Sequence, residues 1–149
     1  MGSADGVARY EVASAAGDID ALMRTLAPDA ELISPLVASA VISGHKDLRV
    51  LLEAVYSTIH DLRWSERLCD DHKVVMIGDA KVGPFRIGDA AVIELAEDGS
   101  IRRIRPHLRP WLATTFFALK VFLKVARHPG LIRRSWRPTY ARALSRAEG

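Results

Sequence analysis

Few side chains in this sequence have the type and setting needed for chemistry. Tyr10 lies in a short apolar stretch near the N-terminus, and its hydroxyl could orient a carbonyl group of a ligand. It could equally be a buried tyrosine whose hydroxyl finds a local partner. Trp64 falls in a segment of strand-like alternation, where an indole is typical of a core or of a pocket wall. These two residues indicate ligand contact and do not by themselves define a reaction.

Residues of the metal-binding types are scattered along the chain. The single cysteine, Cys69, excludes an internal disulfide and any site built from several cysteines, and it is expected to be a small buried hydrophobe. His107 lies among arginines on an expected outward strand face, which favours a solvated or dimer-interface role. The other histidines lack the His-x-His or His-x-x-x-His spacing of a metal site: His45, His60, His72 and His128. We therefore expect no metal, and nothing indicates a cofactor.

The element that would position a site is a hairpin over residues 89–110. Asp98 and Gly99 both tolerate positive φ, so they predict the turn between two antiparallel strands. Alternation places one set of residues on a shared face: Ala91, Ile93 and Leu95, then Ile104, Pro106 and Leu108. We expect this face to be wholly apolar, with no titratable group.

A row of arginines takes the other face of the same hairpin. Arg103, Arg105 and Arg109 alternate with the apolar set, and Glu94 on the neighbouring strand is their natural partner. The row could grip an anion, but a solvated or salt-bridged outer face is the favoured interpretation.

The remaining chain reads as an α+β protein. Apolar spacing and turn residues predict helices over 7–16, 19–26, 45–59 and 111–126, and strands over 31–35, 37–42, 62–69 and 73–82. Pro28-Asp29 is expected to end the second helix, and Gly88-Asp89 to bound a connector before the hairpin. This order favours a curved antiparallel sheet wrapped round the N-terminal helices as a cone-shaped barrel, with a C-terminal helical extension.

Several local motifs resemble a known superfamily. They are Ala8-Arg9-Tyr10, Gly17-Asp18-Ile19-Asp20-Ala21, Pro28-Asp29-Ala30 and Ser34-Pro35. The chain over residues 7–110 is similar to the nuclear transport factor 2-like superfamily, in its SnoaL-like and ketosteroid isomerase-like branch. The resemblance implies the cone-shaped fold, and commonly a homodimer formed through the sheet. It leaves function open, since isomerases, cyclases, epoxide hydrolases and plain binding domains share this fold.

The resemblance also allows a comparison of functional positions. The isomerases use a tyrosine on the first helix as an oxyanion donor, and Tyr10 stands at the matching place. Where they keep a basic aspartate and a protonated aspartate, this chain has Ser34 and Ala91. Because proton abstraction needs a base within hydrogen-bonding reach, the comparison argues against steroid-type isomerisation by that mechanism.

A different branch keeps one catalytic alternative open. The epoxide hydrolases of the superfamily hold a water between carboxylates, with an arginine nearby. Asp79, which follows Gly78 on the expected fourth strand, is the strand-borne acid we would consider for such work. The plainer interpretation is a strand-end or bulge residue that faces water.

The charge of the chain is concentrated at its C-terminal end. The 149 residues carry a net charge of +3, yet residues 120–149 alone hold eight Lys or Arg and one acid, which leaves −4 for the rest. We divide the chain into a domain over 7–110 and a basic amphipathic extension over 111–149. The extension should dock on the core or on a second copy; a membrane surface is an alternative, and nucleic acid is disfavoured.

These observations lead to three functional hypotheses for a protein that we expect to lack a secretory signal and to lie in the cytoplasm. The first is a conical apolar pocket for a small hydrophobic or aromatic ligand, contacted by Tyr10, Ser34, Trp64, Ala91, Ile93, Pro106 and Leu108. The second is a non-catalytic interaction module that uses its C-terminal helix for dimer or membrane-surface docking. The third is an epoxide hydrolase or isomerase-like enzyme using Asp79 and Tyr10.

Overall fold

The computed structural model describes residues 3–37 and 40–136. Its helices are α1 (Ser3–Ala16), α2 (Ile19–Thr25), α3 (His45–Tyr56), α4 (Trp111–Val125) and α5 (Pro129–Ser135). Its strands are β1 (Leu26–Ile33), β2 (Val41–Ser43), β3 (His60–Asp70), β4 (Lys73–Val82), β5 (Phe85–Leu95), β6 (Ile101–Arg105) and β7 (Leu108–Arg109). The last part of the expected extension, residues 137–149, lies outside the described residues, as do residues 38 and 39 of the expected second strand.

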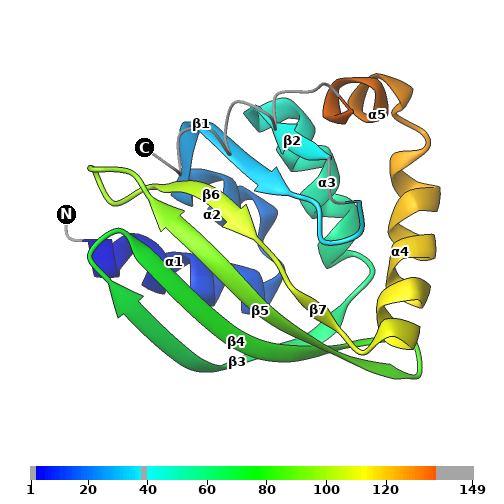
Figure 1. The fold of residues 1–149 in the computed structure, drawn as a ribbon, viewed down its shortest axis with the longest axis horizontal. Helices are drawn as coiled ribbons and strands as arrows, with labels where there is room; N and C mark the ends of the chain where they lie inside the picture. The colour runs from blue at the N-terminus through cyan, green and yellow to red at the C-terminus, as the bar shows by residue number, and fades with distance from the viewer. Residues whose placement is uncertain (1–2, 38–39, 137–149) are drawn as a thin grey trace.

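The strands form one curved sheet in the order β2-β1-β6-β5-β4-β3, and β7 adds to β5. The sheet bends around the helices and leaves its ends unclosed, as Figure 1 shows. This confirms the α+β fold with a curved sheet. One pairing differs from the antiparallel expectation, because β1 runs parallel to β6 while the other described pairs are antiparallel.

The turn signal at Pro28-Asp29 was misleading, because both residues lie inside β1 and the second helix already ends at Thr25. The pairing of β1 with β6 shifts register between Leu26 and Glu31, and β2 pairs only from Glu31 onward. Pro28 therefore falls at an irregularity, where a residue without an amide hydrogen costs no ladder hydrogen bond. At the start of α2, Asp18 is the N-cap, and its carboxylate accepts a hydrogen bond from the Ala21 amide at 3.0 Å.

The predicted connector before the hairpin is wrong. The turn consists of Gly83 and Pro84 alone, and β5 already begins at Phe85. From Val82 opposite Phe85 to Lys73 opposite Glu94, the ladder between β4 and β5 runs without interruption. Gly88 and Asp89 are thus paired strand residues, and the hairpin of β4 and β5 is long enough to cross the whole domain.

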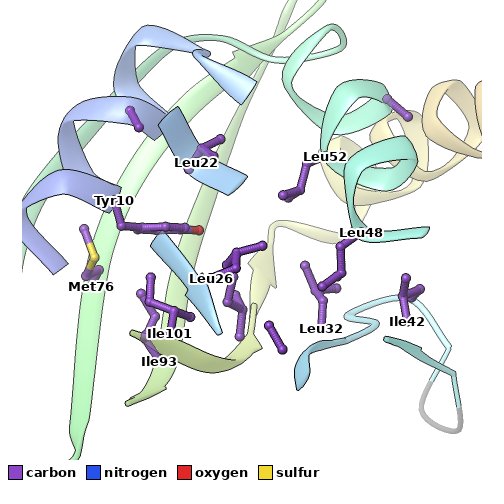
Figure 2. Packing of buried hydrophobic residues seen from close by; sticks show 14 of the residues in the cluster. Tyr10, Leu22, Leu26, Leu32, Ile42, Leu48, Leu52, Met76, Ile93 and Ile101 are labelled. Carbon is purple, nitrogen blue, oxygen red and sulfur yellow. The ribbon is translucent and has the colours of Figure 1, made fainter. Parts of the chain in front are cut away.

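The core lies between the helices and the concave side of the sheet. Figure 2 shows part of it, with Tyr10 projecting from α1 into the interior near Leu22 and Leu26. The helix after the sheet contributes to the same core through Ala113, Phe117, Val121 and Val125, joined by Leu131 of α5. An ion pair also joins α5 to α3: the Arg134 guanidinium donates to both carboxylate oxygens of Asp47, at 2.6 and 2.7 Å.

Two smaller expectations concern the surface. Cys69 was expected to be buried but is exposed, because β3 is the edge strand of the sheet and most of its C-terminal half contacts solvent. The pairing of Glu94 with the arginine row is confirmed: Arg103 donates to Glu94 at 3.0 Å and to Glu31 at 2.6 Å. Within the described segments, no helix is long and apolar enough to cross a membrane.

Candidate functional site

A cavity of about 120 Å³ lies between the concave side of the sheet and helices α1, α3 and α4. Its polar lining comes from Tyr10, Ser34, Tyr56, Trp64, Asp79 and Asp89. Aliphatic and aromatic side chains make up the remainder, among them Leu52, Ile87, Ile104, Phe117 and Val121. A small apolar space with a few convergent polar groups is the usual form of a small-molecule site.

The residues expected to contact a ligand divide into two groups. Tyr10, Ser34, Trp64, Pro106 and Leu108 all line the cavity. Ala91 and Ile93 do not; they are buried in the sheet core, opposite Met76 and Val74 of β4. Whether the first group binds a ligand stays a prediction.

The most consequential group in the cavity is Asp89, which the sequence analysis missed. It lies on β5 between Ile87 and Ala91, on the face that was expected to hold no titratable group. Burial raises the pKa of the Asp89 carboxyl to about 6, although the hydrogen bond from the His107 amide at 3.0 Å and the His107 side chain act in the opposite direction. Such a carboxyl changes protonation state near neutral pH, as a general acid or base requires.

Two tyrosine hydroxyls lie in the same part of the cavity. Burial raises the pKa of Tyr10 well above its ordinary value, and the neighbouring Tyr56 and the charge of Asp89 raise it further. Burial, helped by the charge of Asp89, also raises the pKa of Tyr56 to about 12. Both phenols are therefore neutral at physiological pH and keep their hydroxyl protons.

A chain of hydrogen bonds through Ser14 and Trp64 holds these tyrosines in place. The Tyr10 hydroxyl donates a hydrogen bond to the Tyr56 hydroxyl, which is also hydrogen-bonded to Ser14. The Ser14 hydroxyl accepts from the Trp64 indole at 2.8 Å and donates to the Glu11 carbonyl at 3.0 Å. This places Trp64 in a positioning role, besides its place in the cavity lining.

Asp79 has a different environment from Asp89. Its neighbours Gly78 and Ala80 are buried, and alternation along β4 puts the Asp79 side chain on the other set of positions. The carboxylate is 45% exposed and lies 3.4 Å from the guanidinium of Arg86, itself largely exposed. The Asp79 carboxylate thus lies in a solvated, ion-paired environment at the edge of the cavity.

Ser34 and His107 also have local structural partners. The Ser34 hydroxyl accepts from the amides of Leu36 and Val37, both at 3.1 Å, so it closes the turn after β1. The His107 ring contacts the Ala90 carbonyl at 3.0 Å, and its amide holds Asp89. Because both residues are engaged in these local contacts, we assign neither of them as the catalytic base.

The alternation of inward- and outward-facing residues along β5 was the sequence signal from which Asp89 could have been predicted. Counting back by two from the buried Ala91 leads directly to it. Tyr56 could have been predicted in the same way, because it follows the buried Leu48 and Leu52 at intervals of four residues on α3. Across the described residues, no group of three His, Cys, Asp or Glu side chains is arranged to hold a metal ion.

A curved sheet that wraps helices around a mainly apolar cavity defines the nuclear transport factor 2-like, or cystatin-like, class of fold. Within that class, a SnoaL-like domain model matches residues 7–104, about two thirds of the chain. The protein belongs to the SnoaL-like family. No protein among the curated sequences matches this chain.

Solved structures confirm the fold. An uncharacterised protein from Silicibacter pomeroyi with a cystatin-like fold superposes with a TM-score of 0.80 at 20% identity, covering 87% of this chain and 93% of its own. A steroid delta-isomerase from Pseudomonas aeruginosa gives 0.77 at 23% identity, covering 86% and 94%. The epoxide hydrolase/cyclase-like enzyme SalBIII, described for pyran ring formation in salinomycin, gives 0.62 at 18% identity, covering 74% and 92%. At these identities the likeness concerns the fold alone.

Proposed function

We propose that the cavity binds a small, uncharged, mainly apolar carbonyl compound, and that Asp89 moves a proton on it. One observation carries this proposal: a desolvated carboxyl lies in the same small cavity as two neutral tyrosine hydroxyls. Burying a carboxyl in an otherwise apolar space costs free energy, and a carboxyl perturbed in this way is typical of functional sites. This replaces Asp79 with Asp89 in the enzyme hypothesis and keeps Tyr10.

The size of the cavity limits the substrate. A volume of about 120 Å³ is close to that of an engineered apolar cavity, roughly 150 Å³, that accepts benzene. A molecule of about one ring fits such a space, whereas a four-ring steroid does not. The proposed substrate class is therefore a single-ring or similarly small ketone.

In the proposed reaction, Asp89 carries out two proton transfers in turn, assisted by Tyr10. The ionised Asp89 carboxylate takes a proton from a carbon next to the carbonyl. The Tyr10 hydroxyl turns its proton from Tyr56 to the carbonyl oxygen and donates a hydrogen bond there as negative charge develops. The protonated Asp89 then returns that proton to a different carbon, which shifts the double bond and restores the enzyme. The names of the neighbouring isomerase and cyclase-like enzyme fit this reaction type and are not evidence for it.

A direct test uses a β,γ-unsaturated cyclohexenone, whose conjugated product is followed by its ultraviolet absorption. We expect turnover to rise with pH through about 6, as Asp89 loses its proton. Asp89→Asn should lower turnover by roughly 10²–10⁴-fold because the base is lost. Tyr10→Phe should lower it by roughly 10²–10³-fold because the oxyanion donor is lost.

Asp79→Asn is the informative companion variant. If Asp79→Asn abolished turnover while Asp89→Asn retained it, the carboxyl assignment would be wrong and the earlier alternative would stand. Specific binding of single-ring ketones without turnover in the wild-type protein would reduce the proposal to the apolar binding pocket. Absence of both binding and turnover across a panel of small ketones and epoxides would remove it.

A further inference from the structure

The outward side of α4 exposes several large apolar side chains. Trp111 is 76% exposed and Phe122 is 58% exposed, although both are large hydrophobic residues. Together with three leucines they form what we call the α4 outer face: Trp111, Leu112, Leu119, Phe122 and Leu123. Figure 1 shows α4 at the rim of the molecule, so one of its sides faces away from the fold.

The exposed set is one side of a helix whose other side is already packed. Ala113, Phe117, Val121 and Val125 recur at intervals of four and are buried in the core. A surface helix normally carries polar residues opposite such a buried stripe. Here the opposite side is apolar as well, and that pattern marks a surface used for binding.

The charges around this face have one sign. Residues 111–136 contain five Lys or Arg and no Asp or Glu. Lys120 and Arg127 are exposed on α4 and just beyond it, and Arg133 is exposed on α5. Lys124 donates to Ser57 and Thr58 and so belongs to the packed side. An apolar face on a helical segment that carries cations and no acid is complementary to an anionic apolar partner.

We propose that the α4 outer face lies on a lipid surface that contains anionic headgroups. A second copy of the chain fits less well, because packing two such faces together would bring cations toward cations with no acid on α4 or α5 to offset them. Along its axis α4 is about 22 Å long at 1.5 Å per residue, so it rests in the interface and does not cross. Trp111 at the start of α4 and Trp136 after α5, 61% exposed, are of the residue type that settles at headgroup level.

This placement has a consequence for the cavity. Phe117 and Val121 of α4 line the cavity, while Phe122 and Leu119 point the other way. A protein docked through α4 would hold its cavity one helix away from a lipid phase in which small apolar molecules concentrate. Only this consequence rests on the proposed function; the docking itself does not.

The test is flotation of the full chain with vesicles of phosphatidylcholine containing one-third phosphatidylglycerol, against vesicles of phosphatidylcholine alone. We expect binding to the anionic vesicles that weakens at high salt, with a blue shift in tryptophan emission. The double variant Leu119→Ser/Phe122→Ser should lose at least about tenfold in binding. The double variant Lys120→Glu/Arg127→Glu should lose the preference for anionic vesicles.

A matched control removes the same kind of side chain elsewhere. Val12 and Leu68 are 71% and 62% exposed on α1 and β3, and Val12→Ser/Leu68→Ser should float like the wild type. Absence of flotation, or equal loss in the control, overturns the proposal. A dimer in light scattering that dissociates on Leu119→Ser/Phe122→Ser also overturns it and assigns the face to a second copy. Cyclohexenone turnover is measured on the protein without vesicles. A negative flotation result therefore leaves the proposed function of the cavity unaffected.

Discussion

At the scale of single residues, the proposed activity depends on where two carboxyl groups lie. Asp79 and Asp89 are both strand residues that line the cavity, yet the Asp79 carboxylate is paired with Arg86 at the surface, whereas the Asp89 carboxyl is half-buried near two phenols. Their sequence contexts are alike, since each follows a glycine. The difference arises from strand parity and sheet curvature, which decide the face and the depth of burial of each side chain.

Replacing Asp89 should change stability in a pH-dependent way. The folded state holds the Asp89 proton up to about pH 6, whereas the unfolded chain releases it near the ordinary value of about 4. The wild type therefore loses stability as pH rises through this window, and Asp89→Asn does not. We expect the two proteins to be similar below pH 4 and the variant to be more stable by about 3 kcal/mol at pH 8.

Urea unfolding at both pH values measures this difference without any knowledge of the substrate. A gain in stability on removing a charged side chain is typical of a site kept for activity. A variant that is less stable than the wild type at pH 8 would show that Asp89 is a structural group.

The sequence allowed some of these residues to be predicted and concealed others. Tyr10 was identifiable because its spacing from the Gly17-Asp18 turn follows a known pattern. Asp89 was concealed because a Gly-Asp pair is a strong local turn signal, while its place in a strand depends on the pairing with β4. Long-range strand pairing outweighed the local preference here, and a single sequence does not encode that pairing visibly.

At the scale of elements, α4 is a helix with two apolar sides and two different surroundings. Sequence periodicity was sufficient to place it within one residue of its observed end, because Trp111 to Val125 is a long uninterrupted helical pattern. It was insufficient to say which side would be buried, since both sides read as hydrophobic. That choice is made by the shape of the sheet end and by α3, which contact one side only.

Two phenylalanines on α4 should respond very differently to truncation. Phe117→Ala removes a ring that is 5% exposed, so it should cost about 3–5 kcal/mol of unfolding free energy. Phe122→Ala, on the same helix, removes a mostly exposed ring and should cost less than about 1 kcal/mol. Chemical denaturation of both variants provides the comparison. Equal costs would mean that the outer face of α4 is covered in solution.

At the scale of the whole molecule, α4 separates two proposed functions that use opposite sides of one helix. The cavity depends on its inner side chains and the lipid contact on its outer ones, so each should be removable without the other. The homodimer and the cytoplasmic location remain predictions. So does the division into a domain over 7–110 and an extension, although residues of both segments share one core.

The last prediction separates the two functions by a pair of substitutions on neighbouring residues. Val121→Phe should fill much of the cavity and abolish the thermal shift that we expect from cyclohexenone, while vesicle binding stays at the wild-type level. Phe122→Ser should do the reverse, because its side chain lies outside the cavity. Circular dichroism checks that both variants remain folded, since overpacking costs roughly 1–3 kcal/mol. If either substitution impaired both functions equally, the two sides of α4 would form one coupled site, and the lipid surface would have to act on the cavity itself.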